Sequence, residues 1–566
     1  MQTSGLPSTS FFFFSFITFL LFLNGCTVLA DHGPVVETAQ GAVRGHVVEG
    51  QNGKNRVEFL GIPFAKPPVG PLRWEAPVTP DAWNQTLNLS HVIPPACSQT
   101  VLQSYTNTNI TIDRSPVSED CLYLNIWTPE EVNEDSALDV VVWIHGGALT
   151  SGGTQFSPLG HMVDETGLIF VSIAYRLGVL GFLSFDGVED ANLGILDQRL
   201  ALQWISQNIA AFGGNPNSIT IIGHSAGGMS VLFHLVNDEI SSLFHRAIIM
   251  SPGTFYIFPP SQLETVSARL ATTLECETLS CLREYNATEL IKAASDDGTF
   301  FTAIVGEDSI PYHPLNRIVD GHYNKDIDVI FGEVDQEGNF ILMGIIGAPF
   351  DMQEFVYDFA LGAYFPEDAQ QIADLYVPVS DEEGFWNAGA KVTGDSNLLC
   401  GTDFVIRAMA SHGTNVYRYL FTHRPIHAPA DYLNCTHGSE VPFFFLDPHA
   451  YHLQEVLVSR FSTEEEAFSR RIVNLWTSFA KTGEPTDSEN EEFVWPLWDN
   501  DEQQVTLFNL DVETVTYDNS RVYYCYEFWN DFFGVNTTSF YSDSSSGSNE
   551  DGSHAASLSP FQTILF

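Results

Sequence analysis

The chain has 566 residues, of which 44% are hydrophobic and 17% charged, a composition typical of a globular protein with a large core. Its 71 acidic and 23 basic residues give a formal net charge of −48, which argues against nucleic acid or an anionic membrane as a partner. The acidic residues are spread along the chain, which favours a role in solubility over the steering of a cationic substrate. No linker or repeat interrupts residues 31–536, so we expect one large α/β domain with insertions.

The first 30 residues are typical of a signal peptide. Residues 11–23 are almost wholly apolar, and residues 28–30 (Val-Leu-Ala) form a cleavage signal. The apolar run is too short for a membrane span, so we expect a secreted protein with no stable membrane insertion. The alternative is a lipid anchor on Cys26, because residues 23–26 are similar to a bacterial lipoprotein processing site.

A buried strand is predicted over residues 138–144, Leu-Asp-Val-Val-Val-Trp-Ile, and it runs into His145-Gly146-Gly147-Ala148. Glycines at this position leave backbone N–H groups unshielded, so Gly146 and Gly147 can donate to an oxyanion. The alternative is a Gly-rich turn without a catalytic role, and this interpretation would be preferred if no nucleophile followed in the sequence.

The most informative stretch is residues 223–227, Gly-His-Ser-Ala-Gly. A β-branched strand is predicted before it, over residues 218–222, and a helix after it, over residues 228–236. A strand that turns sharply into a helix holds Ser225 in a strained conformation with its hydroxyl exposed. This setting favours a nucleophile over a Gly-rich turn, and the N–H of Ala226 would join Gly146 and Gly147 as an oxyanion donor.

A nucleophilic serine needs a base and an orienting acid, which in α/β-hydrolases follow in the order serine, acid, histidine. Residues 329–332 predict a strand, and the loop at its end carries Glu333, Asp335 and Glu337. All three carboxylates qualify as the acid on this argument. Among 17 histidines, His437 is favoured as the base by its downstream position and the glycine that follows it.

The remaining signals concern secretion and metal binding. Of eight cysteines, Cys26 leaves with the signal peptide, and the odd remainder predicts one free thiol. The cysteine spacings do not suggest zinc, and we expect no metal and no cofactor.

A disordered, acidic, Ser/Gly-rich tail is predicted over residues 537–566. The glycosylation motif Asn-x-Ser/Thr occurs at Asn84, Asn88, Asn109, Asn286, Asn434 and Asn536.

At these residues the chain resembles the type-B carboxylesterase/cholinesterase family of α/β-hydrolases. The resemblance covers roughly residues 35–535 and includes further blocks at residues 59–70, 118–127, 175–183 and 192–214. It implies a single hydrolase domain over residues 31–536, with a large, mostly parallel, twisted central sheet flanked by helices.

The resemblance also implies roles for individual residues. The family's acid lies in a D/N-x-E-G-x-F-like loop that residues 335–340 match, which selects Glu337 over Glu333 and Asp335. The family's histidine lies in an H-G-x-E block that residues 437–440 match. The implied disulfides are Cys97–Cys121, Cys276–Cys281 and Cys400–Cys525, and the implied structural ion pairs are Arg73–Glu119 and Arg176–Asp197. Cys435 is then free beside the active site, where bulky thiol reagents would block substrate entry if they reached it.

Two departures bear on the substrate. Cholinesterases carry an acidic residue before the nucleophile and a tryptophan upstream, where this chain has His224 and Thr111. We therefore expect a secreted serine hydrolase of small, neutral carboxylic esters that acts through an acyl-enzyme. The alternatives are a lipase for longer acyl chains and a neuroligin-like adhesion protein with an idle triad. The retained Ser225, Glu337 and His437 argue against the adhesion class.

Overall fold

The computed structural model describes residues 33–535 except 51–52, 90–92, 100–115, 158, 254–256, 258–259, 297–299, 348–350, 429–433, 449, 451–457, 489 and 491. The expected signal peptide with Cys26, the expected tail, Thr111 and the glycosylation sites Asn109 and Asn536 lie outside these residues. From Gly33 onward, the described residues belong to one compact unit.

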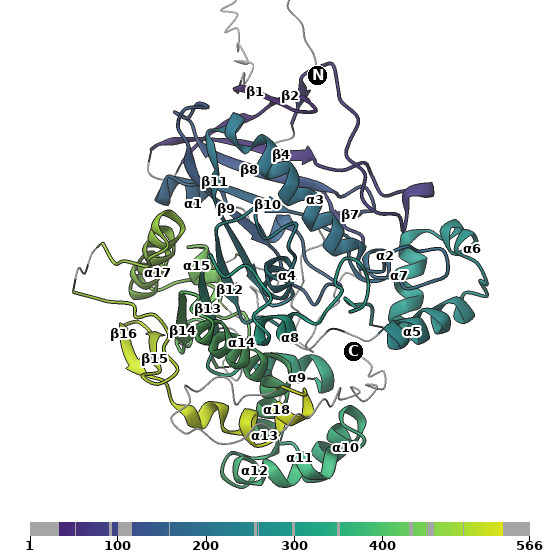
Figure 1. The fold of residues 1–566 in the computed structure, drawn as a ribbon, viewed down its shortest axis with the longest axis vertical. Helices are drawn as coiled ribbons and strands as arrows, with labels where there is room; N and C mark the ends of the chain where they lie inside the picture. Colours follow the sequence, from purple (N-terminus) through teal and green to yellow (C-terminus); the bar gives the residue numbers. More distant parts are fainter. Residues whose placement is uncertain are drawn as a thin grey trace, which may run out of the picture. The chain divides into compact units, whose positions relative to one another are not determined.

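A mixed sheet of 11 strands, counted over the described residues, runs through this unit (Figure 1). The run from β15 to β10 is parallel, whereas β16 at one edge and β8, β4 and β3 at the other pair antiparallel. The predicted large, mostly parallel sheet is therefore confirmed. In spatial order the strands are β16 (Val512–Thr516), β15 (Gln504–Phe508), β14 (Val416–Phe421), β13 (Asp328–Val334), β12 (Arg246–Met250), β11 (Gly214–His224), β9 (Leu138–Ile144), β10 (Ile169–Ile173), β8 (Tyr123–Pro129), β4 (Asn55–Pro63) and β3 (His46–Glu49).

Two small sheets complete the strands of the described part. One contains β1 (Val35–Thr38), β2 (Gly41–Arg44) and β5 (Leu87–Asn88), and the other contains β6 (Ala96–Cys97) and β7 (Val117–Ser118).

The central strands are apolar on both faces because helices cover both faces of the sheet. On β9, Val140, Val142 and Ile144 belong to one apolar core, while Val141 and Trp143 belong to a second core. This alternation follows from the two-residue period of a strand. It explains why the sequence of β9 is apolar at every position from Val140 to Ile144.

The helices lie on both sides of the sheet (Figure 1). Helices α3 and α4 pack against β11, with α4 also against β9 and β12, and α14 packs against β14. Helix α1 packs against β4, β8 and β10, α17 packs against β9 and β11, and the two helices contact each other. The helices are α1 (Gly160–Thr166), α2 (Gly178–Gly181), α3 (Leu193–Asn208), α4 (Ala226–Leu235), α5 (Pro260–Thr273), α6 (Leu279–Glu284), α7 (Ala287–Asp296), α8 (Pro314–Val319), α9 (Gly338–Ile346), α10 (Glu354–Tyr364), α11 (Ala369–Leu375), α12 (Val377–Glu383), α13 (Phe385–Gly394), α14 (Cys400–Ser411), α15 (Val441–Phe444), α17 (Thr463–Thr482) and α18 (Asn530–Phe532).

The segment between α3 and β11 changes its backbone conformation twice. Helix α3 stops at Asn208, and Ile209–Phe212 continue it as a tighter 3₁₀ turn. Gly213 then adopts a left-handed conformation with φ of 83°, which allows the chain to reverse into β11.

Covalent and ionic links tie distant segments together. Disulfides join Cys97 to Cys121, Cys276 to Cys281 and Cys400 to Cys525, which are the expected pairings. The Arg73–Glu119 and Arg176–Asp197 ion pairs are both present. The described glycosylation motifs place Asn84, Asn88, Asn286 and Asn434 at exposed positions. Over the described ranges, no helix has the length and apolarity needed to cross a membrane.

Candidate active site

Ser225 lies at a sharp turn between β11 and α4. Its φ of 58° and ψ of −122° are unusual for a residue with a side chain, and such strain is common at functional sites. The Ser225 N–H donates to the carbonyl oxygen of Met250 at 2.9 Å, and the Ser225 carbonyl accepts from Met229. Strand β12 and helix α4 therefore hold the backbone of this turn in place.

The glycines on either side of Ser225 are required by close backbone contacts. A Cβ atom on Gly223 would lie 2.2 Å from the carbonyl oxygen of Gly227. A Cβ atom on Gly227 would lie 2.1 Å from the carbonyl oxygen of Ile144, at the end of β9. Both distances are impossible for real carbon atoms, so only glycine lets the strand turn so tightly into the helix.

The segment after β9 lies directly against this turn. A Cβ atom on Gly146 would be 2.6 Å from the carbonyl oxygen of His224 and 3.2 Å from Cβ of Ser225. Gly147, Ala148 and Leu149 all have positive φ, at 113°, 55° and 60°. This strained backbone brings the glycine segment beside Ser225, where N–H groups can face a substrate oxygen.

Helix α4 contributes further donors because it begins at Ala226. The first N–H groups of a helix have no acceptor within the helix, and the helix dipole favours negative charge there. The N–H groups of Gly146, Gly147 and Ala226 thus belong to two segments that meet at Ser225.

Aromatic packing immobilises the glycine segment. The rings of His145 and Tyr175 stack with centroids 4.3 Å apart, and the Tyr175 hydroxyl donates to the His145 carbonyl at 2.7 Å. Burial lowers the pKa of His145 to about 4, so this imidazole is neutral at physiological pH.

His437 and Glu337 are brought together from segments 100 residues apart. Nδ1 of His437 and Oε2 of Glu337 are 2.7 Å apart, and both side chains are buried. The other carboxylate oxygen, Oε1, accepts a hydrogen bond from the N–H of Val334 at 2.9 Å. A carboxylate held in this way fixes the orientation of the imidazole that it contacts.

The loops that carry these two residues are joined by their backbones. The Gln336 N–H donates to the Cys435 carbonyl, and the Phe340 N–H donates to the Thr436 hydroxyl, both at 2.9 Å. The relative position of Glu337 and His437 therefore depends on backbone contacts as well as on their own hydrogen bond.

The two rival carboxylates have other partners. Glu333 lies within β13, where it accepts two hydrogen bonds from Arg418 and one from the hydroxyl of Tyr517. Asp335 forms an ion pair with Arg521. Of the three carboxylates, Glu337 is the one that contacts His437.

His437 lies beside the turn that carries Ser225. Its ring and that of His224, the residue before Ser225, have centroids 4.6 Å apart and planes tilted by 35°. Nε2 of His224 is 3.6 Å from Oε1 of Glu440. Glu440 is buried near Glu337. Its burial, and to a smaller extent repulsion from Glu337, raise the pKa of Glu440 to about 8.

Sequence reasoning missed Glu440 as part of this cluster. The signal was available, because Glu440 is the last residue of the H-G-x-E block that identified His437. The pairing with His224 depends on how β11 approaches the loop before α15, which no local pattern reveals.

Cys435 is free but inaccessible. Its side chain is 3% exposed, its thiol donates to the Phe421 carbonyl, and burial raises its pKa well above the usual range. Thiol reagents would block substrate entry only if they reached Cys435, and the burial of its side chain prevents this.

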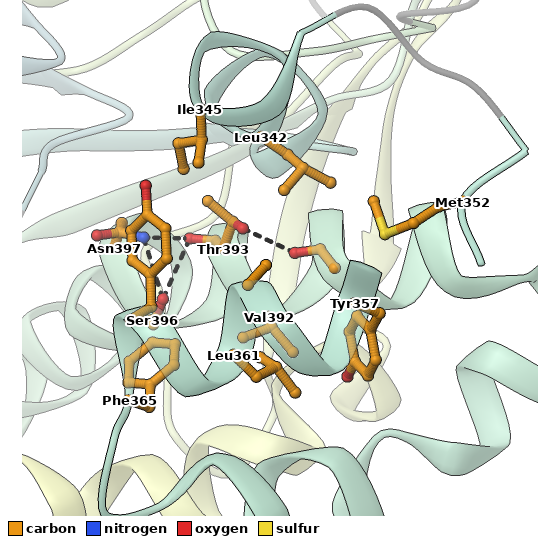
Figure 2. Close-up of a pocket in the computed structure, with 13 residues that line it drawn as sticks. Leu342, Ile345, Met352, Tyr357, Leu361, Phe365, Val392, Thr393, Ser396 and Asn397 are labelled. Carbon is orange, nitrogen blue, oxygen red and sulfur yellow. Dashed lines mark hydrogen bonds between the residues drawn. The ribbon is translucent and has the colours of Figure 1, made fainter. Parts of the chain in front are cut away.

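An apolar pocket lies next to the helix that begins after Glu337. Side chains of α9, α10 and α13 line it, and its volume is about 440 Å³ with the space open to solvent included (Figure 2). Leu342, Val392 and Leu361 point into it, whereas Thr393 and Asn397 form a polar group at one end (Figure 2). Within the described residues, no group of three or more His, Cys, Asp or Glu side chains could hold a metal ion.

Comparison with known proteins identifies the family of the chain. A model of the carboxylesterase family matches residues 32–528. The chain is 34% identical to an acetylcholinesterase of Bungarus fasciatus over 88% of this chain and 86% of that protein. It is 32% identical to an acylcarnitine hydrolase of Mus musculus, over 88% and 91% of the two chains. It is 33% identical to a medium-chain fatty acyl-CoA hydrolase precursor of Anas platyrhynchos, over 86% and 92%. The chain therefore belongs to the carboxylesterase family and is a carboxylic-ester hydrolase.

Proposed function

We propose that this protein is a secreted serine esterase that hydrolyses small, neutral carboxylic esters through an acyl-enzyme. Ser225 attacks the ester carbonyl, and His437 takes the serine proton and then gives it to the leaving alcohol. Glu337 orients His437 and stabilises its charged form. Gly146, Gly147 and Ala226 donate to the oxyanion, and water then releases the acid from Ser225.

The contact between Glu337 and His437 is the observation that supports this proposal most strongly. The 2.7 Å contact between Glu337 and His437 joins a buried carboxylate to a buried imidazole, and that imidazole packs against the residue before Ser225. A base that is oriented by an acid and lies next to a strained serine is the arrangement that nucleophilic catalysis needs.

Substitution of the serine and of the three carboxylates tests these roles. With nitrophenyl esters, Ser225→Ala should lower kcat by about 10⁴-fold or more, and Glu337→Gln by about 10³–10⁴-fold. Asp335→Asn and Glu333→Gln are the matched controls, and each should retain activity in proportion to its folded fraction, measured by circular dichroism. A fully active Glu337→Gln beside an inactive, folded Asp335→Asn would overturn the assignment of the acid.

Two further experiments separate the alternatives. An organophosphate should label Ser225 covalently, whereas a binding protein with an idle triad would remain unlabelled. A series of nitrophenyl esters of increasing acyl length should show highest efficiency for short chains. A steady rise with acyl length would instead favour a lipase.

Secretion and the domain limits need their own measurement. We propose a hydrolase domain over residues 31–536 that follows a cleaved signal peptide. N-terminal sequencing of protein from the culture medium should begin after Ala30, and protein retained on membranes through Cys26 would contradict secretion.

A further inference from the structure

A second imidazole–carboxylate pair lies against the first. His224 is the last residue of β11 and is wholly buried, and its ring packs on the ring of His437. Nε2 of His224 is 3.6 Å from Oε1 of Glu440, and the same oxygen accepts a hydrogen bond from the Ser251 hydroxyl at 3.1 Å. His437 therefore has one carboxylate partner at Nδ1 and a second imidazole on its face.

Acidic and neutral groups of the described residues surround this pair. Glu337 before α9, Tyr419 on β14 and Cys435 interact electrostatically with Glu440, and His437 packs on His224. Burial, reinforced by the nearby carboxylates, raises the pKa of Tyr419 and that of Cys435 well above their usual values, so both stay neutral. A proton is favoured on Glu440 at neutral pH for the same reason, since its pKa is raised to about 8.

We propose that His224 is a positioning residue for His437, and that the His224–Glu440 pair carries one titratable proton at neutral pH and so places no net charge beside the catalytic imidazole. This inference rests on the proposed role of His437 as the base. Ring packing restricts rotation of His437 about its bond to Cβ and keeps Nδ1 directed at Glu337. When the pair loses its proton to solvent at alkaline pH, its negative charge stabilises the imidazolium that forms on His437 during attack.

Three substitutions separate the packing role from the proton-holding role. His224→Ala removes the ring, His224→Phe keeps a flat ring without a proton site, and Glu440→Gln keeps the shape without ionisation. His234→Ala is the matched control, because His234 is also a wholly buried imidazole, lies on α4 and bonds Gln198 rather than facing His437.

We expect His224→Ala to lower kcat by about tenfold to a hundredfold with little change in KM, since misplacement of a catalytic group costs this much. His224→Phe should recover most of that loss. The parent should show a rise in kcat centred near pH 8. Glu440→Gln should lack this rise, whereas His224→Phe keeps the ionisable Glu440 and should shift the rise to higher pH, because the carboxylate loses its imidazole partner. His234→Ala should lower the melting temperature but keep the parent pH profile in its folded fraction.

The failures of the two proposals are distinguishable. If Ser225→Ala and Glu337→Gln keep parental activity, the proposed function falls, and this inference falls with it. If those variants are inactive but His224→Ala has the parent kcat, or Glu440→Gln keeps the rise near pH 8, only the role of His224 and Glu440 is overturned. Should His224→Ala not fold, the pH profiles of His224→Phe and Glu440→Gln still decide the matter.

Discussion

Gly227 faces the carbonyl oxygen of Ile144 so closely that a Cβ atom on Gly227 would lie 2.1 Å from it. The end of β9 and the start of α4 are thus in direct backbone contact. Because the glycine segment follows Ile144 and Ser225 precedes α4, this one contact sets the spacing between Gly146-Gly147 and Ser225.

Gly227→Ala should separate these two elements. We expect loss of most esterase activity and destabilisation by about 1–3 kcal/mol, the usual cost of added volume in a packed site. Gly362→Ala is the control, since Gly362 is exposed on α10 and a Cβ there meets nothing within 4 Å. That variant should gain up to about 1 kcal/mol of stability and keep full activity. Thermal melts and initial rates measure both, and an active Gly227→Ala would show that the contact is not needed.

The thiol of Cys435 should be unreactive in the native protein. In a chain that starts at residue 31, a bulky aromatic disulfide reagent should label no thiol until the protein is unfolded, and one thiol thereafter, because the side chain is 3% exposed. Treatment of the native enzyme should leave hydrolysis unchanged. Rapid native labelling with loss of activity would mean that the loop before His437 opens in solution.

Neutral esters should be preferred to choline esters. Cholinesterases carry an acid where this chain has His224 and a tryptophan where it has Thr111. Loss of the cation–π contact with that tryptophan costs about 2 kcal/mol, or roughly thirtyfold in discrimination between the two kinds of ester. Catalytic efficiency on butyrylthiocholine should therefore be below that on an uncharged thioester of equal acyl length at moderate salt. Attraction by the acidic surface should fade with added salt. A salt-resistant preference for the choline ester would contradict the proposed substrate class.

Glu440 should make stability fall as pH rises. In the folded state its pKa is raised to about 8, whereas a glutamate in the unfolded chain has its ordinary pKa of about 4.5. Between these values the folded state holds the extra proton, so the free energy of unfolding decreases with rising pH, and the loss is complete above about pH 8. The penalty is at most ~5 kcal/mol. The Glu440→Gln variant has no carboxyl group to ionise at this position. The difference in melting temperature between this variant and the parent should therefore increase in favour of the variant from about pH 5 to pH 8.5. A constant difference over that range would show that Glu440 is already ionised at low pH.

The sequence predicted those parts of the site that local patterns encode. The β9 strand, the turn at Ser225 and the loop after β13 each follow from short apolar runs bounded by glycines. The choice among three carboxylates needed family resemblance, because Glu333 is held by Arg418, 85 residues away, and by Tyr517, 184 residues away. The same limit applies to the burial of Cys435 and to the pairing of His224 with Glu440. Such contacts depend on the packing of distant elements, which periodicity does not describe.

The Cys400–Cys525 disulfide spans 125 residues of sequence and encloses His437, while Ser225 and Glu337 lie outside the enclosed segment. A single proteolytic cut inside that segment therefore produces a two-chain protein whose pieces remain covalently attached. If the cut falls before His437, Ser225 and His437 belong to different polypeptides, as in a naturally processed heterodimer. Such nicked protein migrates as one band without reductant and as two bands with it.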